Sequence, residues 1–254
     1  MSETDVKAPH LLSGKVVLIT GGSRGIGAAI ARRFAAVGSR VAIGYRSGGD
    51  AAKAVLSSIA DLGAEALGVQ GDIADATAAR ELVATTVARF GQLDILVNCA
   101  GIAPYRPFEA VDAAFVNAMF ETNVLGTVLV MQAALPHLPS PGGRIINFSS
   151  AMATRPVPTS SIYAASKAAI STLSHALSKE LGSRGITVNA VAPGVIETEM
   201  TKDILAQRGD AIVAQTPLGR IGQTDDIAGL VLFLASPEAG WITGRTIIAD
   251  GGIS

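Results

Sequence analysis

The hydrophobic and polar positions of the chain form two alternating kinds of segment. Short, continuous apolar runs predict buried strands, because a strand covered on both faces has no polar side. Longer segments with apolar residues three or four positions apart predict helices that pack through one face. The predicted strands are 15–20, 41–45, 66–70, 95–98, 144–149, 187–192 and 246–249, and the predicted helices are 25–37, 50–62, 75–90, 112–134, 159–181 and 224–234.

This alternation predicts an α/β fold with a parallel sheet, because helices must cross over between parallel strands. Right-handed crossovers then give a single-domain, doubly wound Rossmann fold with seven parallel strands and helices on both faces. Residues 13–254 are expected to form the domain, and residues 1–12 a flexible tail. The segment 197–222 lacks a clear core pattern. Such a long connection is expected to be a lid over a site, and a surface insertion is the alternative.

Composition removes several classes of function. The 254 residues are 49% hydrophobic with a net charge of −1, so a large core is expected and a nucleic-acid surface is not. A single cysteine, Cys99, excludes an intrachain disulfide, and three scattered histidines predict no metal site. The start of the chain lacks a signal-peptide pattern, and the apolar run 229–235 is too short to span a bilayer. A cytoplasmic protein without membrane contact is expected.

A glycine-rich turn follows the first predicted strand and leads into a helix. Residues 20–27 read Thr-Gly-Gly-Ser-Arg-Gly-Ile-Gly, with the spacing Gly-x-x-x-Gly-x-Gly. Glycines allow a close approach of the backbone to a pyrophosphate, and the helix N-terminus supplies free N–H groups. The strand before the turn and the helix after it favour a dinucleotide site over a plain connection.

The residues after the second strand indicate which dinucleotide binds. An NAD site has an acidic residue there for the ribose hydroxyl, but this chain has Tyr45, Arg46 and Ser47, with Arg24 in the glycine turn. Two guanidinium groups and a hydroxyl suit a 2′-phosphate, because arginine binds phosphate through paired hydrogen bonds. The sequence therefore predicts NADP(H). In the alternative, both arginines are solvated surface charges.

Three residues indicate proton-transfer chemistry. Tyr163 and Lys167 lie four positions apart and share one face of a predicted helix. A tyrosine titrates near pH ~10, and a neighbouring ammonium group is expected to lower that pKa, so Tyr163 is the expected general acid or base. Ser150 ends the fifth strand, where ligands of such sheets bind, and can donate a hydrogen bond to a substrate oxygen.

The order of these motifs resembles the short-chain dehydrogenase/reductase family from about Gly14 to Gly252. Each motif is common by itself, but the full series in this order is specific. Cys99 departs from the second Asn of the family's usual Asn-Asn-Ala-Gly, and we expect it to pack without thiol chemistry. The matching pieces are the glycine turn 20–27, Asp72, 98–101, Asn123, Ser150, Tyr163 with Lys167, Pro193 with Gly194, and 250–252.

The resemblance implies a role for each matching residue. Ser150 orients the carbonyl, Tyr163 is the acid or base, Lys167 holds the nicotinamide ribose, and Asn123 anchors a water in a proton relay. Asp72 and Ile73 bracket the adenine. The residues implied in cofactor binding are Gly21, Ser23, Arg24, Gly25, Ile26, Gly27, Tyr45, Arg46, Ser47, Asp72, Ile73, Asn98, Ala100, Gly101, Tyr163, Lys167, Pro193, Gly194, Ile196 and Thr198.

The expected activity is hydride transfer between NADP(H) and a small carbonyl compound or secondary alcohol. The segments 183–189 and 193–201 also resemble 3-oxoacyl-[acyl-carrier-protein] reductases, and Arg184 could dock an acidic carrier. The residues 138–143 lack the basic side chains expected before strand five of such enzymes, so this function is the second choice. A non-catalytic NADPH-binding protein is the third. The resemblance also implies a homotetramer, with the predicted helices 112–134 and 159–181 at one interface.

Overall fold

The computed structural model describes residues 11–254, and all seven predicted strands form one parallel sheet. The strand order is β3-β2-β1-β4-β5-β6-β7, so the predicted fold class is confirmed. The strands are β1 Val16–Thr20, β2 Arg40–Tyr45, β3 Ala66–Gln70, β4 Ile95–Asn98, β5 Arg144–Phe148, β6 Thr187–Pro193 and β7 Thr246–Ala249. The α-helices are α1 Gly25–Ala36, α2 Gly49–Asp61, α3 Ala76–Phe90, α4 Ala113–Phe120, α5 Gly126–Ala134, α6 Ser161–Leu181, α7 Lys202–Gln215 and α8 Thr224–Ala235.

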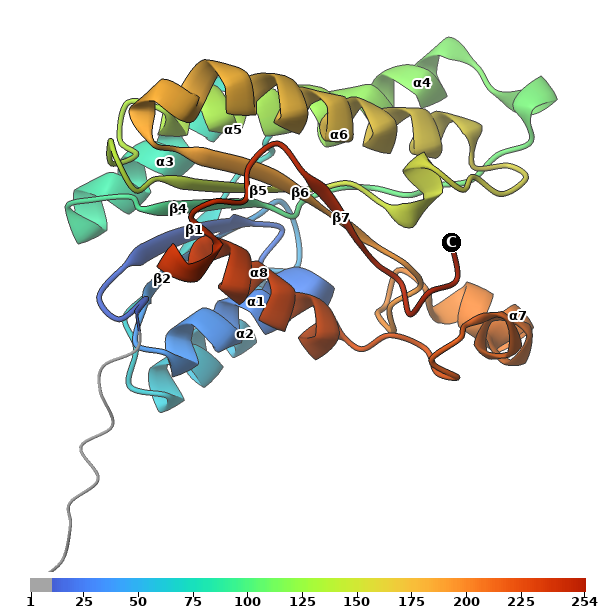
Figure 1. Cartoon of the computed structure of the whole chain (residues 1–254), viewed down its shortest axis with the longest axis horizontal. Coiled ribbons are helices and arrows are strands. Elements are labelled where there is room, and N and C mark those ends of the chain that lie inside the picture. Colours follow the sequence, from blue (N-terminus) through green and yellow to red (C-terminus); the bar gives the residue numbers. More distant parts are fainter. Residues whose placement is uncertain (1–10) are drawn as a thin grey trace, which may run out of the picture.

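The helices cover the sheet on both faces. Helices α1, α2 and α8 lie on one side, and α3, α5 and α6 lie on the other (Figure 1). Alternate residues of a strand point to opposite faces, so Val17 and Ile19 of β1 enter the first core, whereas Val16 and Leu18 enter the second. This arrangement explains why the strands read as continuous apolar runs.

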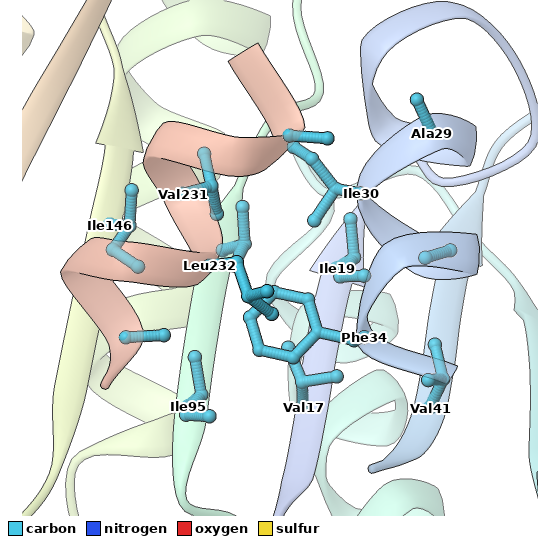
Figure 2. Close-up of a cluster of buried hydrophobic side chains, with 14 of the residues drawn as sticks. Val17, Ile19, Ala29, Ile30, Phe34, Val41, Ile95, Ile146, Val231 and Leu232 are labelled. Carbon is cyan, nitrogen blue, oxygen red and sulfur yellow. The ribbon is translucent and has the colours of Figure 1, made fainter. Parts of the chain in front are cut away.

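The first core is built around Phe34. Its side chain is fully buried, and Figure 2 shows the ring directed from α1 toward Val17 of β1 and Leu232 of α8. Helices α1 and α8 are neighbours although about 200 positions separate them, because the apolar faces of both cover the same part of the sheet. This contact joins the first and last thirds of the chain in one hydrophobic core.

The segment 197–222 contains a helix that the hydrophobic pattern does not predict. Helix α7 has no fully buried residue, and its apolar side chains are only half-buried. Without a buried stripe there is no helical period to recognise. Figure 1 shows α7 at the end of the sheet beside the C-terminus, away from the two helical layers. A cavity of about 220 Å³ is lined in part by Ile212 of this helix, and the lid stays a prediction.

The predicted helix 112–134 is interrupted. Helices α4 and α5 flank a π-helical segment, η2 (Glu121–Leu125), and the backbone stays helical throughout. A π-helical turn holds one extra residue and is frequent at functional sites. Apolar spacing in the sequence does not reveal it, because both halves keep their own helical period.

The packed part of the chain begins before residue 13, the predicted start of the domain. Leu12 is buried in the first core, and its carbonyl oxygen accepts a hydrogen bond from the Ser39 hydroxyl at 2.8 Å. The prediction of a flexible tail that extends through residue 12 is therefore corrected at Leu12. Burial of the leucine side chain and a buried hydrogen bond fix this position. Residues 1–10 of the expected tail lie outside the described residues.

One helical stretch is long and apolar enough to cross a membrane by length and composition alone. It is Ala113–Ala134, with a mean hydropathy of 1.4 in its most apolar window, of which 33% is buried. Core helices of globular proteins pass the same test, and here α4 packs on α6 and α5 on α3. The absence of membrane contact stays a prediction.

The fold generates a stability prediction for Phe34. We expect Phe34→Ala to lower the free energy of unfolding by about 3–5 kcal/mol, because the ring leaves a cavity in the first core. Phe108→Ala is the matched control, since that ring is 72% exposed, and it is expected to change stability by less than about 0.5 kcal/mol. Denaturant titration measures both. Equal losses for the two variants would contradict the assigned core.

Candidate active site

The glycine turn and the end of β4 meet where the strand order reverses. Chain connections leave β1 and β4 in opposite directions, which opens a crevice at the carboxyl ends of the strands. The Ala100 N–H donates a hydrogen bond to the Thr20 hydroxyl at 3.1 Å. Gly21 has a φ of +68°, and a Cβ there would lie 2.8 Å from the Ala100 Cα. Only glycine allows this approach, so the turn forms a narrow cradle beside residues 98–101.

The basic residues predicted for a 2′-phosphate gather at the end of β2. The Arg24 guanidinium lies 3.5 Å from the Ser47 hydroxyl, and Arg46 forms an ion pair with Asp72 at 3.3 Å. These side chains are solvent-accessible. The structure therefore brings Arg24, Arg46, Ser47 and Asp72 together. The group contains two guanidinium groups and one carboxylate, so its net charge is positive.

Three predicted cofactor-binding residues direct their side chains elsewhere. Tyr45 packs against the first core, and Ile73 is buried in the second core against Gly126 of α5. The Asn98 side chain is buried and donates to Asn147 Oδ1 at 2.9 Å. The Ile73 and Asn98 side chains are buried, whereas Tyr45 stays partly exposed.

The segment after β6 forms the other wall of the crevice. Pro193 ends β6, and Gly194 packs so closely on Asp250 that a Cβ would lie 2.5 Å from the Asp250 Cβ. Ile196 is buried and pairs with Gly222 through a parallel bridge. Thr198 lies near Gly25 of the glycine turn, 3.4 Å from the position of a Cβ at that glycine. Of the predicted residues of this segment, Thr198 thus faces the turn that opens α1.

The four predicted catalytic residues lie together. Lys167 is buried, and its ammonium group donates to the Phe148 carbonyl oxygen at 2.9 Å. Gly101 is the point where Asn123 and Lys167 meet, because a Cβ there would lie 3.1 Å from Asn123 Oδ1 and 3.3 Å from Lys167 Nζ. Lys167 Nζ is 5.9 Å from the centre of the Tyr163 ring.

The π-helical segment η2 presents Asn123 toward this group. The Asn123 amide binds both backbone groups of Ile102, accepting from its N–H at 2.8 Å and donating to its carbonyl at 2.9 Å. It also contacts Ser166 Oγ at 3.1 Å and Met119 Sδ at 3.2 Å. This clamp joins the loop after β4 to α6, so Asn123 holds the site together.

The two adjacent serines after β5 have different partners. The Ser149 hydroxyl donates to the Lys167 carbonyl oxygen at 2.9 Å and contacts the Ser171 hydroxyl at 2.8 Å. The Ser150 hydroxyl accepts from the Met152 N–H at 3.2 Å and lies close enough to the Tyr163 phenol to lower its pKa. Ser150 therefore faces the phenol, and Ser149 fastens α6 to the sheet.

The protonation of the site differs from the expectation. Burial raises the pKa of Tyr163 to about 12, and the hydrogen bond with Ser150 opposes this rise only in part. Burial also lowers the pKa of Lys167 to about 8. The prediction that the ammonium group lowers the Tyr163 pKa is therefore corrected: in this chain by itself, the Tyr163 pKa is raised. The physical reason is that both groups have lost water, which favours the neutral form of each.

Cys99 occupies the second position of the β4 motif. It packs against the first core, and burial raises the pKa of its thiol to about 12. A thiol with such a pKa is not a nucleophile at neutral pH, in keeping with the expected packing role. Among residues 11–254, no three His, Cys, Asp or Glu side chains gather as they would around a metal ion.

Several contributors to the site escaped sequence reasoning. They are Ser166, which also donates to the Tyr163 carbonyl at 2.7 Å, Met119, the Phe148 carbonyl and the Ile102 backbone. Tyr105 is not one of these, because the sequence already predicts it in the substrate wall, and its ring packs edge-on against Tyr163. Backbone partners leave no signal in a sequence. The spacing of Met119 and Asn123, four positions apart on one helix, was the one available sign.

The chain is similar to known proteins over nearly its whole length. A family profile described as Enoyl-(Acyl carrier protein) reductase matches residues 21–254. An L-rhamnose 1-dehydrogenase (NAD(P)(+)) of Sphingomonas sp. is 38% identical over 247 residues, which are 96% of this chain and 97% of that protein. A 3-oxoacyl-[acyl-carrier-protein] reductase of Staphylococcus aureus is 39% identical over 240 residues, 94% and 98% of the two chains.

The fold is also found in solved structures. A short-chain dehydrogenase of Burkholderia cenocepacia, crystallised in complex with NADP, superimposes with a TM-score of 0.91. It is 42% identical, and the match covers 96% of this chain and 99% of that one. Family profile, relatives and architecture agree over nearly the whole length, so the chain belongs to the short-chain dehydrogenase/reductase family and is an oxidoreductase.

Proposed function

We propose that the protein is an NADP(H)-dependent oxidoreductase that interconverts a small carbonyl compound and its secondary alcohol, with Tyr163 as the proton donor. The observation that carries this proposal is the contact of the Ser150 and Tyr163 hydroxyls at the carboxyl end of β5, beside the buried Lys167. Two hydroxyl donors that converge on one point suit a carbonyl oxygen.

The crevice fits a dinucleotide. Gly21 and Gly101 leave room where any Cβ would meet Ala100, Asn123 or Lys167. Arg24, Arg46 and Ser47 supply donors for a 2′-phosphate, and the N–H groups at the start of α1 suit the pyrophosphate. The NADP complex of the Burkholderia cenocepacia relative supports the same choice. Lys167 and Asn98 would lie near the nicotinamide half.

When bound, NADPH supplies the hydride. The Ser150 hydroxyl orients the carbonyl oxygen, and the Tyr163 hydroxyl donates a proton to it as negative charge develops. Asn123 and Lys167 would connect the phenol to solvent through a water. Because the pKa of Tyr163 is raised to about 12, the phenol is protonated at neutral pH. The protonated phenol is the form that carbonyl reduction needs, whereas alcohol oxidation needs the deprotonated form, so the rate of oxidation is expected to rise with alkaline pH.

A 3-oxoacyl-[acyl-carrier-protein] reductase is the second candidate, supported by the Staphylococcus aureus relative. Carrier docking needs free basic side chains. Arg184 instead donates to the Leu135 carbonyl oxygen of its own chain at 2.9 Å. Comparing 3-oxoacyl thioesters on carrier protein and on coenzyme A with simple ketones would separate the two functions. A non-catalytic role would require Ser150, Tyr163 and Lys167 to be idle.

The protein is proposed to act in the cytoplasm as a homotetramer. The outer surface of Ala113–Ala134 supports the assembly, because this apolar stretch is only one-third buried within a single chain. Leu125, in the middle of the stretch, is 45% exposed. Apolar surface of this kind is typical of subunit interfaces.

Replacement of Tyr163 tests the reaction. We expect Tyr163→Phe to lower kcat with a ketone by at least about 10³-fold, since the proton donor is lost, while the Kd for NADPH stays within about twofold. Tyr45→Phe is the matched control, because that ring packs in the first core. Cofactor oxidation at 340 nm and fluorescence titration give the two readouts. Substantial turnover by Tyr163→Phe would refute the assigned role.

Replacement of Arg46 tests the cofactor preference. We expect Arg46→Ala to weaken NADPH binding by roughly 10–100-fold, because a charge-assisted contact is lost. NADH binding is expected to weaken by less than about threefold. The ion pair with Asp72 is also lost, so the NADH titration separates a local disturbance from phosphate recognition. Arg32→Ala is the control, because Arg32 contacts Ser58 on the far side of α1. Equal weakening for both cofactors would speak against NADP(H) selectivity.

Burial of Lys167 makes a prediction about stability. Its pKa is about 8 in the folded chain and 10.5 otherwise, so the unfolded chain binds more protons between these values. Stability therefore rises with pH from about 8 to 10.5 as the cost of the buried charge is removed.

We expect Lys167→Met to be more stable than wild type at pH 7, by roughly 1–3 kcal/mol, and the difference to shrink at pH 10. Denaturant titrations at both pH values measure it. A destabilised variant at pH 7 would mean that the Phe148 hydrogen bond outweighs desolvation.

A further inference from the structure

Tyr105 lies between the catalytic tyrosine and solvent. It belongs to the loop that follows β4, and its ring meets the Tyr163 ring edge-on, with 5.9 Å between ring centres and 69° between planes. The Tyr105 hydroxyl contacts Met152 Sδ at 3.4 Å. The residue is nevertheless 45% exposed. The Tyr163 ring thus borders an aromatic ring that is itself open to solvent and has a thioether beside it.

The backbone around Tyr105 is fixed in place. The Arg106 N–H donates to the Thr159 carbonyl oxygen at 3.0 Å, which ties the loop after β4 to the segment before α6. Thr159 has a φ of +70°, the only positive value at a non-glycine position in the described part of the chain. A β-branched residue adopts this conformation only when its surroundings impose it. The hydrogen bond between Arg106 and Thr159 thus fixes the position of Tyr105 before any substrate binds.

The neighbouring Arg106 side chain strengthens this anchor. Its guanidinium lies 4.3 Å from the centre of the Phe115 ring and pairs with Asp112 at 3.2 Å. Asp112 also caps α4 by accepting from the Phe115 N–H at 2.7 Å. Arg106 is therefore engaged with α4, and the charge of this loop is compensated. What remains open toward the site is the apolar pair of Tyr105 and Met152.

We propose that Tyr105 and Met152 form a specificity wall that selects carbonyl substrates with an aryl or other flat apolar substituent. This inference rests on the proposed function, in which Ser150 and Tyr163 hold the carbonyl oxygen. With the oxygen there, one substituent of the carbonyl carbon lies against Tyr105 and Met152. Aromatic rings favour edge or offset contact with another ring, and a thioether packs well on a ring. A polyhydroxylated chain would lose water there without gaining partners.

The test compares two ketones in wild type and three variants. Phenyl methyl ketone carries the predicted substituent, and hydroxyacetone is the small polar reference. Tyr105→Ala is expected to lower kcat/KM for phenyl methyl ketone by about tenfold or more and to change that for hydroxyacetone by less than about threefold. Tyr105→Phe keeps the ring and is expected to retain the wild-type ratio. Phe108→Ala, which removes an exposed ring from the same region, is the matched control.

The outcomes separate this inference from the proposed function. If wild type reduces ketones but Tyr105→Ala leaves the ratio of the two substrates unchanged, the wall is refuted and the proposed function stands. If wild type reduces no ketone, the proposed function fails, and calorimetric titration of NADP-loaded protein with 1-phenylethanol decides the inference by itself. Binding that Tyr105→Ala weakens about tenfold supports the wall, whereas absent or unaltered binding overturns it. A loss with Tyr105→Phe equal to that with Tyr105→Ala would assign selectivity to the hydroxyl and also overturn it.

Discussion

The seam between β5 and α6 is the contact on which the rest of the site depends. Three hydrogen bonds of 2.9 Å cross it, from Asn147 to Ser174, from Ser149 to the Lys167 carbonyl and from the Lys167 ammonium to the Phe148 carbonyl. All are buried or partly buried, so each would be costly to leave unmade. Together they fix the position of α6 along β5, and this position places Tyr163 next to Ser150. The general fold requires only that some apolar helix face cover the sheet, whereas the chemistry requires this register.

Most of the fold could be predicted because it follows from burial. The five inner strands are covered on both faces, which leaves continuous apolar runs in the sequence. The predicted ends of all seven strands agree with the structure to within about one residue. The failures occur where burial is weak or local. Helix α7 has no buried stripe, η2 keeps the helical period on either side, and Leu12 is one buried residue beside an exposed leucine before the first strand. None of these three features changes the spacing of apolar residues over many positions, so the hydrophobic pattern does not reveal them.

The site could be predicted as a set of residues but not as an electrostatic environment. Motif spacing places Ser150, Tyr163 and Lys167 at one edge of the sheet, and the structure has them there. The sequence does not disclose how much water each group loses, and this loss reverses the expected direction of the Tyr163 pKa shift. It also does not disclose that Tyr45 and Ile73 turn into the cores. Side-chain direction within a loop depends on contacts with distant segments.

The π-helical segment η2 divides one continuous helix into halves that face different neighbours. Each residue of an α-helix advances about 100° around the axis, so one additional residue rotates everything that follows by about a quarter turn. Helix α4 packs on α6, and α5 packs on α3. Had the helix been regular, a single apolar stripe would have had to serve both partners. The inserted residue thus rotates the apolar stripe between the two halves, so that each half presents its own apolar face to its own neighbour.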